Sequence, residues 1–124
     1  MSIPLRIPYE KHHSFTVQFG KNLPLAYLVS YPRSGNTWIR YLIEATTGLA
    51  TGSLYISDLL INMGYLGEGE NPYGGTVIIV KSHCFGAENK SFDDIYKYEI
   101  PVVLLLRNPY RYAHNYCLIT YIFN

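Results

Sequence analysis

The sequence has little cysteine, little charge and no long apolar run, and each shortage excludes a class of protein. Only Cys84 and Cys117 occur among the 124 residues, which is too few for a disulfide framework or a cysteine-based zinc site. We expect two buried thiols, with one disulfide in an oxidising compartment as the alternative. A net charge of +1 gives no general attraction to nucleic acid, so any anion-binding site must be local.

The missing apolar run bears on membranes and export. A membrane-spanning helix needs about 18 or more consecutive apolar residues, and no stretch of the sequence provides them. Residues 1–20 contain charged and histidine side chains and no long apolar segment, unlike a cleavable signal. We therefore expect no membrane segment within this chain.

A large apolar fraction is present, and it is arranged in short runs. Apolar residues make up 48% of the chain and charged residues 15%, which supports a packed core. The runs at 25–30, 76–81 and 101–106 are nearly continuous, as expected of strands buried on both faces. Helical spacing follows the first run at 37–45, where Trp38, Tyr41 and Leu42 share one face.

The remaining segments predict shorter helices and a loop. Residues 57–63 can form a short helix that Ser57 caps, and another short helix is expected near Tyr96. The glycine-rich stretch 64–75 must be a loop, and residues 110–123 can form a final helix. Gly48 is a plausible stop for the first helix.

Alternating strands and helices predict an α/β fold: a parallel sheet with right-handed crossovers and flanking helices. Residues 1–22 are mixed in character, and we expect an irregular lead-in there. Three strands make a small sheet and the chain stops near its last helix. We therefore expect residues 23–124 to be the N-terminal portion of a domain that is truncated here.

A first candidate site lies between the first strand and its helix, at residues 30–38. Gly35 allows the backbone to approach a ligand closely, and a helix start presents unpaired N–H groups to an anion. Arg33 adds a fixed charge with bidentate geometry. Short polar donors follow at Ser34, Asn36 and Thr37. The alternative is an ordinary strand–turn–helix connection. The segment departs from the nucleotide-triphosphate loop, whose first glycine and lysine are missing here.

Eight residues of this segment, Tyr-Pro-Arg-Ser-Gly-Asn-Thr-Trp at 31–38, resemble the 5′-phosphosulfate loop of the sulfotransferases. The resemblance implies a P-loop-type sulfotransferase fold and the donor 3′-phosphoadenosine-5′-phosphosulfate (PAPS), with no metal. Donor-binding roles then fall on Arg33, Ser34, Gly35, Asn36, Thr37 and Trp38. Many family members have lysine at the position of Arg33. Arginine keeps its proton near neutral pH, so Arg33 would stabilise the leaving phosphate electrostatically.

A second candidate is Lys81-Ser82-His83, at the end of the second apolar run. Ligands bind at the carboxyl edge of parallel sheets, and strand alternation puts Lys81 and His83 on one side. A structural histidine is the alternative. The pattern is similar to the sulfotransferase element whose histidine deprotonates the acceptor hydroxyl. That similarity implies His83 as the general base and Lys81 as a helper near the sulfuryl group.

A third candidate is Arg107-Asn108-Pro109, after the last apolar run. An arginine at a strand end beside a helix start suits a phosphate monoester, although it can equally pair with a surface acid. The segment resembles the sulfotransferase 3′-phosphate element, in which a serine follows eight residues after the arginine. Here that position is Asn115, whose amide can still donate to phosphate. The resemblance thus implies Arg107 and Asn115 as donor-binding residues.

Within the superfamily, the sequence resembles the sulfotransferase domain of WSC-domain-containing proteins, the sialate O-sulfotransferases. The segments 30–44, 45–48, 51–53, 67–69 and 106–110 carry this likeness, which covers roughly residues 26–112. It implies sulfuryl transfer from PAPS to a hydroxyl of a glycan, with sialic acid as one candidate acceptor. It also implies a Golgi membrane location for the full-length relatives.

Two other functions remain open at the level of sequence. The chain could be a truncated, catalytically inactive PAPS- or nucleotide-binding fragment or paralogue, which the abrupt end at Asn124 favours. It could also be a P-loop kinase or NTPase. Against the latter stand the incomplete phosphate loop and the lack of an obvious Mg²⁺-binding aspartate after Val80 or Leu106.

Overall fold

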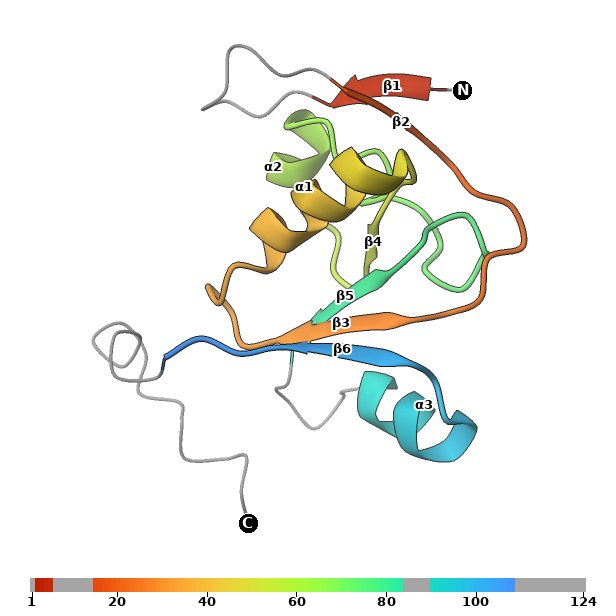
Figure 1. Cartoon of the computed structure of the whole chain (residues 1–124). Helices are drawn as coiled ribbons and strands as arrows, with labels where there is room; N and C mark the ends of the chain where they lie inside the picture. Colours follow the sequence, from red (N-terminus) through yellow and green to blue (C-terminus); the bar gives the residue numbers. More distant parts are fainter. Residues whose placement is uncertain (1, 6–14, 84–89, 109–124) are drawn as a thin grey trace.

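Four parallel strands form the central sheet of the structure, a computed structural model that describes residues 2–5, 15–83 and 90–108 (Figure 1). The order across the sheet is β4-β5-β3-β6. Their bounds are Tyr27–Ser30 for β3, Gly52–Ser53 for β4, Val80–His83 for β5 and Val102–Leu105 for β6. The expected α/β class with a parallel sheet is confirmed, and the arrangement is compatible with a P-loop-like fold.

The register of the sheet aligns the carboxyl ends of its strands. Ser30, the last residue of β3, lies opposite His83 in β5 and opposite Leu105 in β6. The segments that follow these strands therefore emerge at one edge of the sheet, where ligands bind in open α/β folds. The strand β5 does continue to His83, as the predicted pairing of Lys81 and His83 on one side requires.

Within the described ranges, three helices flank the sheet: α1 (Asn36–Thr47), α2 (Asp58–Asn62) and α3 (Lys90–Tyr98). Figure 1 shows α1 above the sheet and α3 below it, beside β6. The Tyr27 hydroxyl of β3 donates a 2.5 Å hydrogen bond to Asp94 of α3. Two predicted helix boundaries are confirmed: Ser57 Oγ accepts from Leu60 N at the start of α2, and Gly48 ends α1 in the left-handed region at φ 68°.

The buried face of α1 differs from the predicted apolar face. Its buried residues are Asn36, Arg40, Tyr41 and Glu44, of which three lie at intervals of four and so share a face. Trp38 is 55% exposed and Leu42 38% exposed, so of the three residues predicted to share one face only Tyr41 is buried. A polar stripe thus faces the interior, and it needs partners there.

The segment 1–22 contains two strands, in place of the irregular lead-in that its sequence predicts. The strands β1 (Ser2–Leu5) and β2 (Phe15–Gln18) pair antiparallel. Val17 of β2 is fully buried, and the Phe15 ring lies 5.1 Å from the Tyr41 ring of α1. Gln18 also exchanges main-chain hydrogen bonds with Gly48 and Ala50. The burial of these side chains and the main-chain hydrogen bonds of Gln18 hold β2 against the domain, and the mixed composition of the segment does not predict them.

Two further strand predictions need correction. The apolar run 76–81 forms a strand only from Val80 onward, because Val77 and Ile79 pack into the core through an irregular segment. A continuous apolar run does not distinguish these two outcomes. The run 101–106 was expected to be buried, yet Val102, Val103 and Leu104 are 44%, 53% and 56% exposed. The strand β6 lies at the sheet's edge in the described chain.

Several predictions fall outside the described residues, namely the helix at 110–123 and the state of Cys84 and Cys117. Within the described ranges, no helix is both long and apolar enough to cross a membrane. The short strand β4, which the sequence does not predict, pairs with β5 through Gly52 and Ser53.

Candidate functional site

A pocket of about 360 Å³ lies at the carboxyl edge of the sheet. Its walls come from the connection after β3 with the first turn of α1, from the end of β5, and from the segment after β6. The lining residues are Pro32, Arg33, Gly35, Asn36, Thr37 and Trp38, then Lys81 and His83, and finally Arg107. The structure therefore brings all three candidate motifs to one pocket, although they are separated by tens of residues in the sequence.

The connection between β3 and α1 uses two left-handed backbone conformations. Arg33 has φ 61° and Gly35 has φ 96°, and the left-handed region is unfavourable for residues other than glycine. A Cβ at Gly35 would meet nothing within 4 Å. The need for glycine there is therefore conformational and not steric. Ser34, between the two, is 8% exposed, and it is not one of the residues that line the pocket.

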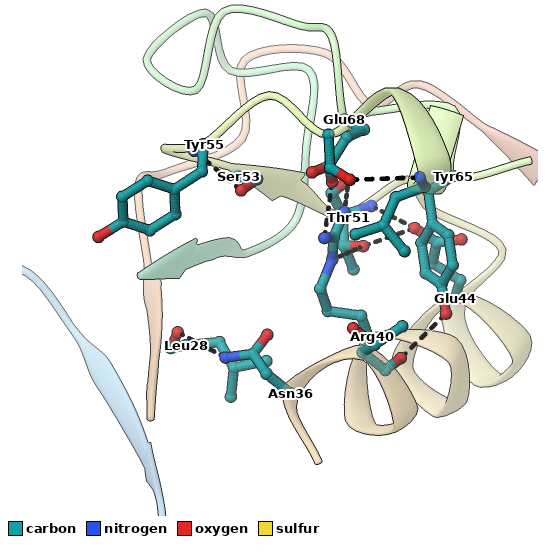
Figure 2. Close-up of polar contacts among 12 residues, drawn as sticks. Leu28, Asn36, Arg40, Glu44, Thr51, Ser53, Tyr55, Tyr65 and Glu68 are labelled. Carbon is teal, nitrogen blue, oxygen red and sulfur yellow. Dashed lines mark hydrogen bonds and ion pairs between the residues drawn. The ribbon is translucent and has the colours of Figure 1, made fainter. Parts of the chain in front are cut away.

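The first turn of α1 faces the pocket with its positive end. Gly35 caps the helix without a side-chain hydrogen bond, and the first turn contains no acidic residue. The helix dipole and the first-turn N–H groups therefore favour an anion at this position. Asn36 contributes less than its sequence position predicts, because its Nδ2 donates inward to Ser30 Oγ at 2.9 Å and to the Leu28 carbonyl at 3.4 Å (Figure 2).

Cationic side chains dominate the pocket. Arg33, Lys81 and Arg107 line it together with His83, and none of the described residues in its lining is an aspartate or glutamate. Burial lowers the pKa of Lys81, and the charge of Arg40 lowers it further, while Glu68 raises it. A bound anion would favour the charged form of Lys81. The pocket is therefore suited to a group that carries negative charge.

His83 has one ring nitrogen committed to the main chain. Its Nδ1 lies 3.0 Å from the carbonyl oxygen of Ser30. A carbonyl oxygen only accepts, so the neutral ring carries its proton on Nδ1 and Nε2 is the basic nitrogen. Burial lowers the pKa of His83, the hydrogen bond to Ser30 opposes this, and the charge of Lys81 adds to the lowering. His83 is thus a neutral imidazole near pH 7, the form that a general base requires.

Arg107 makes a hydrogen bond to the connection between β3 and α1. Its Nη1 donates to the carbonyl oxygen of Arg33 at 3.1 Å, so the segment after β6 is tied to the connection after β3. A guanidinium has five N–H donors, and the side chain also lines the pocket with Arg33. The partner that the sequence assigned to Arg107, Asn115, lies outside the described residues.

Sequence reasoning missed a buried polar network behind the pocket (Figure 2). The guanidinium of Arg40 donates to Glu68 Oε2 at 2.7 Å and to Thr51 Oγ1 at 2.9 Å. Glu44 Oε1 accepts from the main-chain N–H of Thr51 at 2.8 Å, and burial raises the pKa of Glu44. The relative exposure of all four residues is 0%. A charged residue at a helical position among apolar neighbours was the available signal.

Tyr65 connects this network to the pocket. Its ring lies 4.9 Å from the guanidinium carbon of Arg40, and burial raises the pKa of its phenol to about 12. The hydroxyl donates to the carbonyl oxygen of Thr37 at 2.9 Å. Because Thr37 lies in the first turn of α1, the hydrogen bond fixes the helix end that faces the pocket.

Tyr55 is the second residue that the sequence did not indicate. It follows β4, its ring lies 5.4 Å from the His83 ring at an interplanar angle of 20°, and it is 42% exposed. Within the described ranges, no group of three His, Cys, Asp or Glu side chains is arranged to hold a metal ion.

Comparisons with known proteins give a family-level relationship. A WSCD family member from Drosophila pseudoobscura pseudoobscura is 40% identical over 85 residues, covering 68% of this chain and 24% of that protein. A WSCD family member from Aedes aegypti is 44% identical over 64 residues, covering 52% and 20%. One from Drosophila melanogaster is 39% identical over 90 residues, covering 72% and 26%.

No family model and no solved structure matches the chain. The chain spans about a quarter or less of the length of these three relatives, with shares of 20% to 26%. The three similarities, at 39% to 44% identity over partial stretches, support a relationship of this chain to the WSCD family.

Proposed function

We propose that the pocket is the donor site of a sulfotransferase that moves a sulfuryl group from PAPS to a hydroxyl, with a glycan as acceptor. The observation that carries this proposal is the charge of the pocket. Among the described residues, its lining combines Arg33, Lys81 and Arg107 with a helix start that has no side-chain cap, and includes no acidic residue. Such a site favours a phosphosulfate group. The resemblance of residues 31–38 to the phosphosulfate loop supplies the reaction class.

In the proposed reaction, the acceptor oxygen attacks sulfur and forms a new S–O bond. The bond between sulfur and the bridging oxygen of the donor breaks, and 3′,5′-adenosine bisphosphate leaves. Its departing phosphate gains negative charge, which Arg33 and Lys81 stabilise electrostatically. The acceptor proton passes to Nε2 of His83, whose lowered pKa keeps it unprotonated near neutral pH. The reaction balances without a metal or an oxidant.

The acceptor is the least constrained part of the proposal. The resemblance to sialate O-sulfotransferases makes a hydroxyl of sialic acid a candidate. The similarity to WSCD family members covers only part of those longer proteins. An activity shared with them is therefore part of this proposal. The volume of about 360 Å³ lies at the lower end of the range for ligand pockets, roughly 300–1,000 Å³. It suits the phosphosulfate portion of the donor.

The test separates chemistry from binding at His83. Transfer of radiolabelled sulfate from PAPS to sialylated glycans is measured with the full-length protein, beside calorimetric binding of 3′,5′-adenosine bisphosphate. We expect His83→Ala to lower kcat by about 10²–10⁴-fold, the usual contribution of a general base, with donor-product affinity unchanged. Lys97→Ala, an exposed cation outside the pocket, is the control. Near wild-type transfer by folded His83→Ala would exclude His83 as the base.

A further inference from the structure

The pairing of β4 with β5 places Tyr55 beside His83. Ser53 of β4 lies opposite Lys81 of β5, and Leu54 N donates to the Lys81 carbonyl at 3.0 Å. Two residues further along each segment, Tyr55 and His83 are neighbours. The main-chain N–H of Tyr55 donates to Ser53 Oγ at 2.9 Å, which fixes the turn where the chain leaves the strand (Figure 2). The position of the Tyr55 ring is therefore a consequence of strand register.

Two contacts join Tyr55 to His83. The rings stack at a centroid distance of 5.4 Å and an angle of 20°, within the range of offset-stacked aromatic pairs. The main-chain N–H of His83 also lies 3.4 Å from the Tyr55 hydroxyl oxygen, which accepts this long hydrogen bond. The tyrosine thus contacts both the backbone and the ring of the same residue.

A separate contact constrains the ring from its edge. His83 Nδ1 lies 3.0 Å from the Ser30 carbonyl in β3. The carbonyl selects which nitrogen carries the proton, while the Tyr55 ring covers one face of the imidazole. A histidine side chain has two rotatable bonds, so a contact on the edge and another on the face limit both. One contact comes from β3 and the other from the segment that follows β4, and these two strands lie on either side of β5.

We infer that Tyr55 is a positioning residue for His83, whose ring it holds by stacking so that Nε2 remains the basic nitrogen at the pocket. The consequence for the reaction rests on the proposed function, in which His83 is the base. The orientation of the ring does not depend on that function, since it follows from contacts within the protein. A positioning role also gives a reason for an aromatic residue that is 42% exposed beside the pocket.

The stack should also affect the titration of His83. Burial is the largest cause of its lowered pKa, and the Tyr55 ring covers part of the imidazole. Loss of that ring admits water and should bring the pKa of His83 back toward 6.5, its ordinary value. The charged groups around the pocket, Lys81, Arg33 and Arg107, stay in place in Tyr55 variants. A shift can then be assigned to the ring.

Histidine NMR tests the contact directly, without any requirement for activity. In ¹⁵N-histidine-labelled protein, His83 is assigned by the loss of its signals in His83→Gln. We expect the wild type to show the Nδ1–H tautomer and a pKa below 6.5. Tyr55→Leu should give mixed tautomers and a higher pKa, while Tyr55→Phe, which keeps the ring, should restore the wild-type pattern. Unchanged tautomer and pKa in Tyr55→Leu would overturn the inference.

Kinetic measurements then test whether the position of the His83 ring affects catalysis. Because activity requires unprotonated His83, Tyr55→Leu should shift the acidic limb of the kcat profile to higher pH. Misplacement of the base should lower kcat by about 10- to 100-fold, with the Kd for 3′,5′-adenosine bisphosphate unchanged. Ile56→Ala alters the next residue, which is 74% exposed, and should leave both unchanged. If Tyr55→Leu does not fold, Tyr55→Gln serves instead, because it replaces the ring with a polar side chain that suits an exposed position.

The two proposals fail in different ways. A wild-type protein that transfers no sulfuryl group, with the expected NMR change in Tyr55→Leu, would end the proposed function and keep the contact between Tyr55 and His83. An active wild type, with wild-type kcat, pH profile and histidine titration in Tyr55→Leu, would end the role of Tyr55 and leave the proposed function intact.

Discussion

The buried network around Arg40 and the pocket in front of it handle positive charge in opposite ways. Arg40 is fully buried, and its guanidinium is matched by Glu68 and by two oxygens of Thr51. The pocket gathers Arg33, Lys81 and Arg107, and in the part of the chain that the structure describes no acidic residue belongs to its lining. The helix α1 contributes to both regions, with Arg40 and Glu44 in the network and its first turn at the pocket. One cation is thus neutralised within the protein, whereas the pocket cations are placed where an anion can reach them.

The difference indicates which charges hold the fold and which serve a ligand. A buried charge must be paired, because an isolated one is very costly to desolvate. Cations at a solvent-accessible pocket stay partly hydrated, and a bound anion can make charge-assisted hydrogen bonds with them. The two regions are also coupled electrostatically, since the charge of Arg40 lowers the pKa of Lys81 and the charge of Glu68 raises it. The network therefore influences the pocket through charge as well as through the position of α1.

The largest expected effect comes from breaking the charge match of the network. Glu68→Gln leaves the guanidinium of Arg40 buried without its carboxylate, and we expect a loss of about 3–5 kcal/mol in the free energy of unfolding. Urea denaturation measures this loss. The double variant Arg40→Met/Glu68→Leu removes both charges and should be considerably more stable than Glu68→Gln. A loss below about 1 kcal/mol in Glu68→Gln would show that the ion pair does not hold the fold.

A smaller loss of stability is expected from a change at Gly67, in the loop that carries Glu68 into the network. A Cβ at Gly67 would collide with the main-chain oxygen of Thr51 and approach Val77, so Gly67→Ala should cost about 1–3 kcal/mol. Gly69→Ala is the matched control, because the nearest atom to its Cβ is Ile61 Cδ1 at 3.8 Å. Thermal unfolding compares the two. Equal stability of both variants would mean that the loop is not packed against Thr51.

The smallest effect tests the connection between the two regions. Tyr65→Phe keeps the ring against Arg40 but loses the hydrogen bond to the Thr37 carbonyl. A neutral hydrogen bond contributes about 0.5–1.5 kcal/mol, and we expect a loss of that size in urea denaturation. Tyr96→Phe, at a position that is 85% exposed, should change nothing. If Tyr65→Phe matched this control, the hydroxyl would have no part in fixing the helix start.

The sequence could predict the features that depend on nearby residues. The strand β3, the glycine turn, α1 and its end at Gly48 follow one another within about two dozen positions, and local periodicity and turn chemistry report them. The convergence of Arg33, His83 and Arg107 was also predictable. Parallel strands end at one edge of the sheet, and each motif follows a strand.

What could not be predicted depends on tertiary pairing. Arg40 and Glu68 are 28 positions apart, so the apolar neighbours of Arg40 in the helix can hint at its burial but cannot identify its partner. The two-residue strand β4 is too short to produce a periodic signal, so Tyr55 could not be placed beside His83. The sequence also cannot predict that β6 is exposed, because an apolar run has the same composition at the edge of a sheet as at its centre.

The central claim, that the cationic pocket binds the phosphosulfate end of PAPS, is tested most directly by calorimetric titration with 3′,5′-adenosine bisphosphate. We expect the wild type to bind and Arg33→Ala to bind about 10- to 150-fold more weakly, which corresponds to a charge-assisted contact worth about 1.5–3 kcal/mol. Lys21→Ala removes the same charge at an exposed position outside the pocket, and should bind like the wild type. No binding by the wild type, or equal affinity of Arg33→Ala and Lys21→Ala, would contradict the claim.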